Sequence, residues 1–357
     1  MTGPSSAPAS DPATGESTPG PADGKHAGRT SSARSGVARV LDFESNSVLV
    51  ATIVLAAGIG ILHPNFFSLD QIRDVLQQSV YIAVLAAGMC FLLSMREIDL
   101  SVGSIFGLVL IISALLMKHG MNPWLAAIIG IGLGATMGLL NAIVVQVIAI
   151  PAIVATLATL SMFRGLALAL SGGQQVTGLP IESSFFTKFG DNALGVPVSV
   201  WVTLVVAIVL TAVLRLTPFG YRVRSIGSNP EAATFSGISI PRVRIQALVL
   251  MGALAGLAGV LGLAFFQSGD PNIGTGFELQ AIAAAIIGGT SLQGGAGTVV
   301  GAIIGAILLS VVSSGLVYFN VPVNWSAFAT GAVILLAVSL DSLVRRRRRT
   351  RGSGLAL

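Results

Sequence analysis

Charged side chains are scarce in this chain. Only 10% of its 357 residues are Asp, Glu, Lys or Arg, while 53% are hydrophobic; ordinary globular domains carry about 25% charged residues. With a mean hydropathy of +0.86, the soluble classes are excluded and a polytopic helical membrane protein is predicted. The 43 glycines fit this class, because membrane helices pack closely through small residues.

Side chains that catalyse reactions or bind metals are also rare. Cys90 is the single cysteine, so it cannot form an intramolecular disulfide, and we interpret it as a small buried hydrophobic residue. The three histidines lie far apart and predict no metal site. No nucleophile and base, and no pair of carboxylates, stand at catalytic spacing, so we predict a transport protein and not an enzyme. The chain also lacks a G-x-x-x-x-G-K-[ST] motif for ATP phosphates, so its energy must come from elsewhere.

The two ends of the chain differ in composition from the middle. Residues 1–46 are rich in Ser, Ala, Gly and Pro, so we predict a disordered cytoplasmic tail. Residues 345–357 contain the run "RRRRRTR". A nucleic-acid patch is one interpretation of that run, but its place directly after an apolar segment favours a basic cytoplasmic tail that contacts membrane lipid. We therefore predict no nucleic-acid partner.

Residues 47–344 are predicted to form one transmembrane permease domain, an all-α helical bundle of about ten membrane helices. Several apolar runs are shorter than the roughly 20 residues that a bilayer requires, so eight or nine full spans with a re-entrant piece stay open. The predicted runs are 47–62, 78–95, 101–117, 123–147, 151–171, 198–215, 245–267, 277–290, 296–319 and 325–344.

Arginines in the loops predict the orientation of the bundle. Five arginines lie at or between the sixth and seventh runs and six follow the tenth, and short basic segments favour the cytoplasmic side. Four runs separate these regions, so both can be cytoplasmic, and counting back six runs places the N-terminus there too. The loop at 172–197 then lies outside. We expect a protein of the plasma membrane with both termini in the cytoplasm.

The polar stretch "GSNPEAATFSGI" (227–238) predicts a short cytoplasmic helix between two apolar runs. Ser228 or Asn229 can cap this helix, and Pro230 and Glu231 suit its first turn. Ala232 and Ala233 continue the helix, and Gly237 is a natural end. A helix this short is marginal alone in water. It is therefore either a connector that lies against its own bundle or a docking element for a cytoplasmic partner.

Several stretches resemble one family of transporters. "EAATFSG" is similar to the E-A-A-x-x-x-G loop that permease subunits of ABC importers insert into their ATPase subunits, although the I-x-L-P element of the longer form is missing. "EIDLSVGS" (97–104) resembles the signature of permeases that serve ribose, xylose, galactose and related sugars. "AIAAAIIGGTSLQGGAGTVVGAIIGA" (281–306), "IPAIVATLATLSMFRGLALALSGGQ" (150–174) and "GLLNAIVV" (138–145) are similar to further stretches of that group.

The resemblance covers residues 48–343 and departs from the family at Arg96–Glu97, where many members carry Gly-Gly. It implies an importer built from separate parts. An extracytoplasmic binding protein delivers a sugar, two permease subunits form the path, either two copies or two paralogues, and two ATPase subunits bind ATP. In this chain no cofactor is expected, and the helix near Glu231–Gly237 is where nucleotide-driven motion would be received.

Four polar residues are candidates for the translocation path or a gate, because polar groups at membrane depth are costly. Asp99 and Ser101 open the third run, either as an acidic helix N-terminus with an adjacent ion pair or as groups that bind sugar hydroxyls or the opposing helix. Asn141 is expected to bond between helices or to line the path. Arg164 either snorkels to the headgroups or faces the interior and pairs with a carboxylate or carbonyls.

Glycines at small-x-x-x-small spacing predict close helix contacts, within one subunit or between two. The three pairs are Gly134–Gly138, Gly252–Gly256 and Gly301–Gly305. The stretch "GGTSLQGGAG" (288–297) has too many glycines for a helix interior, so it predicts a turn or an unwound segment.

Three hypotheses about function follow from the sequence. The first is a sugar permease of an ABC importer. The second is an ABC permease for another solute, such as a nucleoside or a branched-chain amino acid. The third is an ion-driven secondary transporter, which would require more acidic residues at mid-bilayer depth than the sequence contains.

Overall fold

The computed structural model describes residues 43–322 and, beyond them, residues 325, 328, 329, 331, 332, 335 and 339. The predicted N-terminal tail, apart from its last four residues, lies outside this part of the chain. So do most of the tenth predicted run and the whole basic tail, 345–357.

In the part of the chain that the structure describes, nine apolar helices correspond to the first nine predicted runs, which confirms an all-helical membrane fold. Six of them are long and apolar enough to cross a membrane: α2 (Leu69–Ser94), α4 (Pro123–Val147), α5 (Ala152–Ser171), α7 (Val198–Leu216), α10 (Ile240–Phe266) and α12 (Val299–Tyr318). The other three are α1 (Phe43–Leu62), α3 (Val102–Lys118) and α11 (Phe277–Ile287). This assignment follows from the length and composition of the helices.

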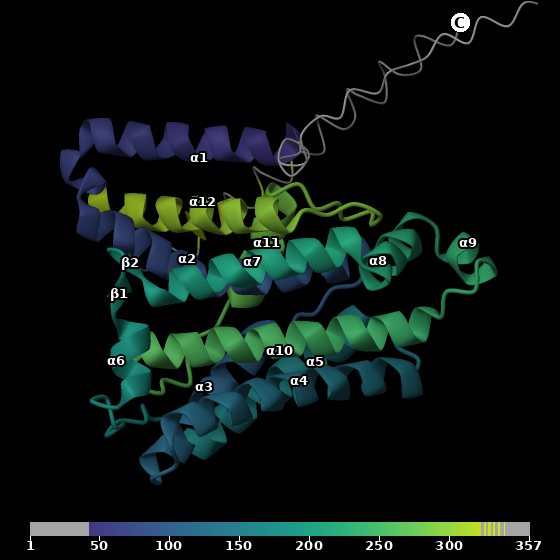
Figure 1. The fold of residues 1–357 in the computed structure, drawn as a ribbon, viewed down its shortest axis with the longest axis horizontal. Helices are drawn as coiled ribbons and strands as arrows, with labels where there is room; N and C mark the ends of the chain where they lie inside the picture. Colours follow the sequence, from purple (N-terminus) through teal and green to yellow (C-terminus); the bar gives the residue numbers. More distant parts are fainter. Residues whose placement is uncertain are drawn as a thin grey trace, which may run out of the picture. The chain divides into compact units, whose positions relative to one another are not determined.

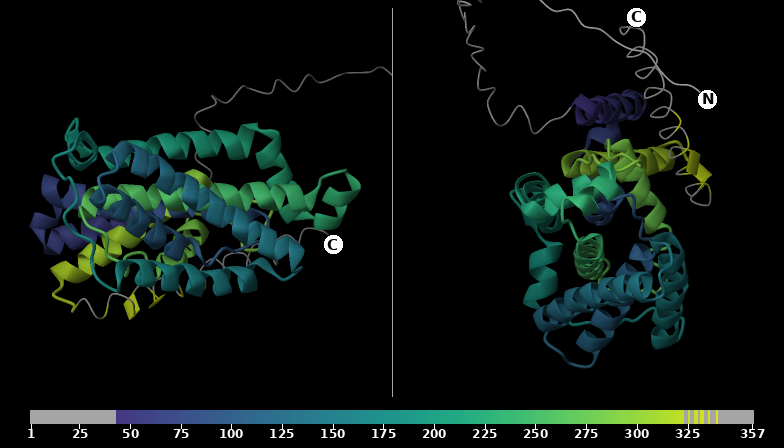
Figure 2. Two further views of the ribbon diagram at one scale, coloured as in Figure 1. Left: turned by 90° about the horizontal axis from the view of Figure 1, so that it is seen from below. Right: turned by 90° about the vertical axis from the view of Figure 1, so that its right-hand side faces the viewer.

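Short elements connect these helices. They are η1 (Pro64–Phe67), α6 (Ser184–Gly190), α8 (Pro218–Ser228), α9 (Pro230–Phe235) and the two-residue strands β1 (Asn192–Ala193) and β2 (Val196–Pro197), which pair as a small antiparallel hairpin. In Figure 1, α6 and the hairpin lie at the left-hand end of the bundle, and α8 and α9 lie at the right-hand end. The left view in Figure 2 keeps these two groups apart.

This separation agrees with the expected placement of the 172–197 loop opposite the segment that follows α7. Which of the two ends faces the cytoplasm stays a prediction.

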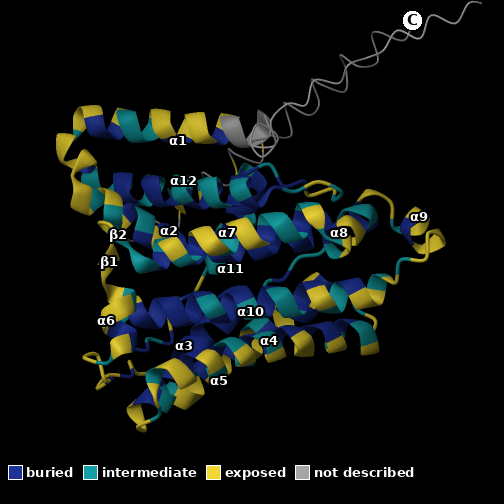
Figure 3. Ribbon diagram, viewed as in Figure 1, coloured by how far each residue is buried: buried dark blue, intermediate teal, exposed yellow. Residues whose placement is uncertain are grey.

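The interior of the bundle is formed by α2, α3 and α10 (Figure 3). In the apolar 18-residue window of α2, 89% of the residues are buried inside the chain, against 28% in the corresponding windows of α5 and α7. Every position from Val80 to Ser94 is buried, and these residues are mostly Ala, Val and Leu with few polar groups. A helix that is apolar all round is suited to a place at the centre, whereas α5 and α7 present exposed apolar faces.

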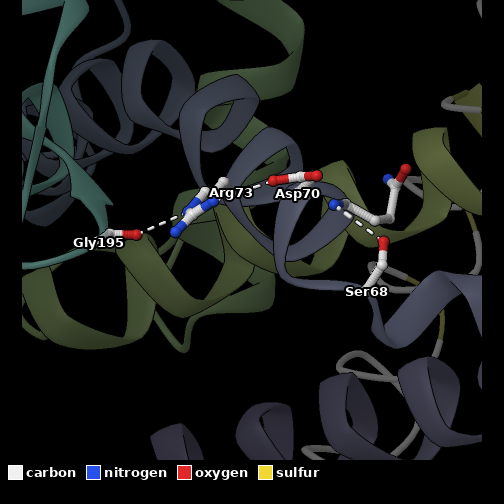
Figure 4. A network of polar contacts seen from close by, with 5 residues as sticks. Ser68, Asp70, Arg73 and Gly195 are labelled. Carbon is white, nitrogen blue, oxygen red and sulfur yellow. Dashed lines mark hydrogen bonds and ion pairs between the residues drawn. The ribbon is translucent and has the colours of Figure 1, made fainter.

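The start of α2 differs from the sequence prediction. The helix begins at Leu69 instead of near residue 78. Its first turns carry polar side chains, so the apolar run that predicted the helix starts only after them. Ser68 caps the helix by accepting from Gln71 N at 3.3 Å, and Arg73 donates to the Asp70 carboxylate at 2.9 Å and to Gly195 O at 2.7 Å (Figure 4). This network ties the first turns of α2 to the β1–β2 turn.

Glycines allow α4 and α10 to touch backbone to backbone. A Cβ placed on Gly134 would lie 2.8 Å from the Cα of Gly256, and one on Gly138 would lie 3.1 Å from the Cα of Val249. Gly252 faces Gly138 in the same way, at 2.9 Å from its Cα. These contacts are within one subunit.

The same holds for α11 and α12. A Cβ on Gly301 would lie 2.9 Å from the carbonyl carbon of Gly288, and one on Gly305 would lie 3.1 Å from the Cα of Ala284. The glycine-rich stretch between these helices is non-helical, as predicted. It turns through positive φ at Gly289, Gly294 and Gly295.

Candidate functional site

The polar helix predicted between the sixth and seventh runs is present as α9. Asn229 caps it by accepting from Ala232 N at 3.0 Å, Pro230 occupies its first turn and Gly237 follows it with φ of 79°. Ala233 is buried and holds the helix against the bundle, while Phe235 is 93% exposed. A hollow of about 540 Å³ lies between α8 and α9 and is bordered by the glycine-rich loop at Gly295. The helix therefore presents an exposed face beside a concave surface.

The connection between α2 and α3, residues 95–101, contacts the start of α9. Arg96 Nε donates to Gly227 O at 2.7 Å, and Arg96 Nη2 donates to Ser228 O at 3.1 Å. Both carbonyls lie at the C-terminus of α8, where helix carbonyls lack intrahelical partners. Arg96 has a backbone φ of 66°, in the left-handed region that residues other than glycine rarely adopt.

The same connection contacts the start of α10. Glu97 accepts from Arg244 Nε at 2.7 Å, and Arg244 Nη2 also contacts this carboxylate. The side chains of Arg244 and Glu97 are 26% and 15% exposed. The ion pair expected between neighbouring residues at 96–99 is thus replaced by one that reaches across 147 positions, because the guanidinium of Arg96 points to α8 instead.

Asp99, Ser101 and Asn141 form one fully buried cluster. The Asp99 carboxylate accepts from Ser101 N at 2.8 Å and from Ser101 Oγ at 2.6 Å. Asn141 Nδ2 on α4 donates to Ser101 Oγ at 2.8 Å and approaches the Asp99 carboxylate at 3.5 Å. Leu100 N donates to Thr156 Oγ1 on α5 at 3.0 Å. The start of α3 is therefore bonded to both α4 and α5.

Among the described residues, Asn141 Oδ1 in this cluster and Ser104 Oγ, three residues beyond Ser101 on α3, are buried and have no hydrogen-bond partner. Buried polar groups are normally hydrogen-bonded, so these atoms offer one acceptor and one hydroxyl to a polar molecule. Gln146, further along α4, donates to Pro241 O of α10 at 3.0 Å.

Arg164 does not join the Asp99 cluster. It lies two turns beyond Thr156 on α5 and is half-buried, and its Nη1 donates to Pro271 O at 2.6 Å and to Ile273 O at 3.2 Å. These carbonyls belong to the loop between α10 and α11. A Cβ on Gly107 of α3 would lie 3.2 Å from this Nη1. Arg164 therefore faces the bundle and pairs with carbonyls, one of the two arrangements expected from the sequence.

Four charged residues of this region are not among the site residues predicted from the sequence. Arg96, Glu97 and Arg244 form the contacts to α8 and α10, and Glu278 lies near Arg164 with a buried Oε2 that lacks a partner. Glu278 was detectable, since it is a carboxylate inside a predicted apolar run. The other three lie in loops or near helix ends, where charges are common.

The comparisons with known proteins agree with this architecture. The family described as the branched-chain amino acid transport system permease component matches residues 71–338. The chain belongs to this family of permeases.

Among its relatives, the ribose import permease protein RbsC of Escherichia coli K12 is 36% identical over 82% of this chain and 92% of that protein. RbsC of Bacillus subtilis is 36% identical over 81% of this chain and 89% of that protein. The autoinducer 2 import system permease protein LsrC of Salmonella typhi is 34% identical over 84% and 86%. No solved structure matches the chain.

The permease is thus a multi-pass membrane subunit of an ABC importer and not an enzyme, and no cofactor is expected in it. An importer of this kind implies a partner ATPase and a binding protein. The resemblance seen in the sequence motifs is confirmed at this level.

Proposed function

We propose that this permease conducts a monosaccharide, delivered by an extracytoplasmic binding protein, and that a separate ATPase subunit drives the cycle. The observation that carries the proposal is the extent of the likeness to ribose import permeases, 36% identity over 82% of the chain in the Escherichia coli relative. Two copies of the permease, or this chain and a paralogue, enclose the path.

In this proposal, α9 is the coupling helix. Its exposed surface, its asparagine cap and the hollow beside it suit the insertion of the element into a partner. The acidic first-turn residue Glu231 and the terminating Gly237 lie at the two ends of the inserted segment. The end of the bundle that carries α9 then faces the cytoplasm, together with both termini. The tails, 1–46 and 345–357, lie on that side, the second in contact with anionic lipid, and residues 47–344 form the membrane domain.

The path or gate includes the buried cluster of Asp99, Ser101 and Asn141. Sugars offer many hydroxyls, and this cluster holds a carboxylate, a hydroxyl and an amide whose Oδ1 has no partner in the structure. Contacts of this kind bind a polyhydroxylated solute weakly, because each protein group already has some of its bonds made inside the chain. Arg164, two turns beyond Thr156 on α5, positions the α10–α11 loop at the path through its bonds to two loop carbonyls.

Two other cargoes have specific support. The family description names branched-chain amino acids, and the Salmonella typhi relative is an autoinducer 2 permease at 34% identity. Both would be served by the same subunit architecture and differ from the proposal in the solute alone.

A reconstituted transport assay tests the proposal. The permease is placed in proteoliposomes with its ATPase and binding protein, and uptake of ribose, xylose, galactose, leucine and autoinducer 2 is measured with and without ATP. We expect ATP-dependent uptake of one of the sugars, and none of leucine. Uptake of leucine or of autoinducer 2 alone would replace the sugar with that solute, and uptake without ATP would overturn the importer mechanism.

A further inference from the structure

Residues 94–101 contact each of the elements that flank the proposed coupling helix. On one side of α9, Arg96 donates to the last two carbonyls of α8, Gly227 O and Ser228 O, which directly precede the cap residue Asn229. On the other side, Glu97 pairs with Arg244, near the start of α10. Two consecutive residues therefore hold both flanks of the helix.

The glycine-rich loop (288–297) packs against the contact between Arg96 and α8. Gly295 N donates to Ser94 O at 2.9 Å, and a Cβ on Gly294 would lie 2.7 Å from Arg96 Cγ. A Cβ on Gly227 would lie 2.5 Å from Gly295 N. The side chain of Arg96 is thus packed between the α8–α9 junction and this loop, which leaves it little room to follow another path when α9 moves.

Behind these contacts, the chain continues into the buried cluster. Leu100 N bonds to Thr156 of α5, and the Ser101 hydroxyl bonds to Asn141 of α4. Only three residues separate Arg96 from Leu100, and contacts at both ends leave this short, non-helical connection little slack to absorb a displacement. A movement of either flank of α9 is carried through residues 96–101 to α4 and α5.

We propose that Arg96 and Glu97 are the positioning residues that transmit motion from the coupling helix to the solute path. The inference rests on the proposed function. Arg96 acts on the flank before α9 and Glu97 on the flank after it, and neither touches solute. Loss of one contact leaves α9 able to bind the ATPase, while its movement no longer reaches Asp99 and Ser101.

The test measures solute uptake per ATP hydrolysed in proteoliposomes that hold the complete transporter. Arg96→Gln is expected to keep ATPase association and hydrolysis while uptake per ATP falls about tenfold, the factor that corresponds to one hydrogen bond to a charged group. Arg96→Lys keeps the positive charge but cannot donate the two parallel hydrogen bonds of the guanidinium, so partial coupling is expected. Arg242→Gln, an exposed arginine two positions from Arg244, is the matched control and should couple normally.

The ion pair allows a charge-swap test. Glu97→Arg and Arg244→Glu are each expected to uncouple the transporter, and the double variant to regain coupling, which a general loss of stability would not produce. Unchanged uptake per ATP in Arg96→Gln, or an equal loss in Arg242→Gln, would overturn the inference.

Failure of the proposed function is distinguishable. If the unaltered chain neither binds an ATPase nor takes up solute, the proposed function has failed, and the contact is then judged by hydrogen exchange in the purified chain. The inference requires that Arg96→Gln raise amide hydrogen exchange both in residues 230–236 and in residues 97–101. Arg242→Gln has to leave the exchange of both segments as in the unaltered chain. Exchange that stays as in the unaltered chain in either segment overturns the inference by itself.

Discussion

Two arginines of this permease hold distant backbone in the same manner but in different surroundings. Arg164 lies inside α5 and donates from Nη1 to two carbonyls of the α10–α11 loop. Arg96 lies in the connection after α2 and donates to two carbonyls at the end of α8. Arg164 is half-buried, whereas Arg96 belongs to the exposed residues.

This difference distinguishes hydrogen bonds that burial requires from hydrogen bonds that serve function. An arginine within an apolar helix must satisfy its donors inside the protein, since an unpaired buried charge is costly. An exposed arginine has water available, so burial does not require the contacts of Arg96. The contacts of Arg96 also hold its backbone in the left-handed conformation, which costs about 1–3 kcal/mol for a residue other than glycine. We infer that Arg164 contributes mainly to stability and Arg96 mainly to coupling.

The largest effect on stability is expected from Arg164→Met. The variant leaves two loop carbonyls unpaired and removes the positive charge near Glu278. Two lost hydrogen bonds to a charged group predict a fall of about 3 kcal/mol in the free energy of unfolding. Thermal unfolding in detergent measures it, with Arg164→Lys expected to fall less. A midpoint equal to that of the unaltered protein would break the comparison, because Arg164 would then need no internal partners.

A smaller effect is expected where α4 and α10 touch through their glycines. Gly134→Ala places a Cβ against the backbone of Gly256, so α4 and α10 must separate, at a cost of about 1–3 kcal/mol. Gly132→Ala, two residues away, meets nothing within 4 Å and should be neutral or slightly stabilising. The same unfolding measurement compares the pair, and equal midpoints would contradict the close contact.

The smallest effect on stability is expected from Arg96→Met. Because water competes for the exposed guanidinium, the free energy of unfolding should fall by about 1 kcal/mol or less. The comparison is sharpened if this variant unfolds close to the unaltered protein while its uptake per ATP is impaired. A loss of stability as large as that of Arg164→Met would remove the distinction between the two arginines.

Much of the fold was predictable from the sequence, because the apolar runs and the glycine spacing are local signals. The ends of helices were less accessible. The first turns of α2 carry Asp70 and Arg73, so the apolar run begins later in the chain than the helix does. The helix α8 was not predicted, because its arginines suggested a loop.

The site was predictable where polar residues stand out against the apolar pattern. The α9 helix was predicted from a polar stretch between two runs. Asn141 lies inside a run and Asp99 and Ser101 lie at the start of one, and these three residues meet in one cluster. The contacts of Arg96 and Glu97 join positions 131 and 147 residues apart. No local pattern specifies such a pairing, because it depends on how α2, α8 and α10 pack in three dimensions.

The central claim is that α9 connects this permease to an ATPase. The most direct measurement is to tag the chain, extract it gently from its native membrane and quantify the ATPase that co-purifies. We predict a stoichiometric ATPase for the unaltered chain, its loss in Glu231→Lys, and its retention in Glu182→Lys. Glu182 is an exposed carboxylate just before α6, and α6 lies at the opposite end of the bundle from α9 in Figure 1. Co-purification that survives Glu231→Lys would contradict the role of α9, and a chain that purifies alone would contradict the claim as a whole.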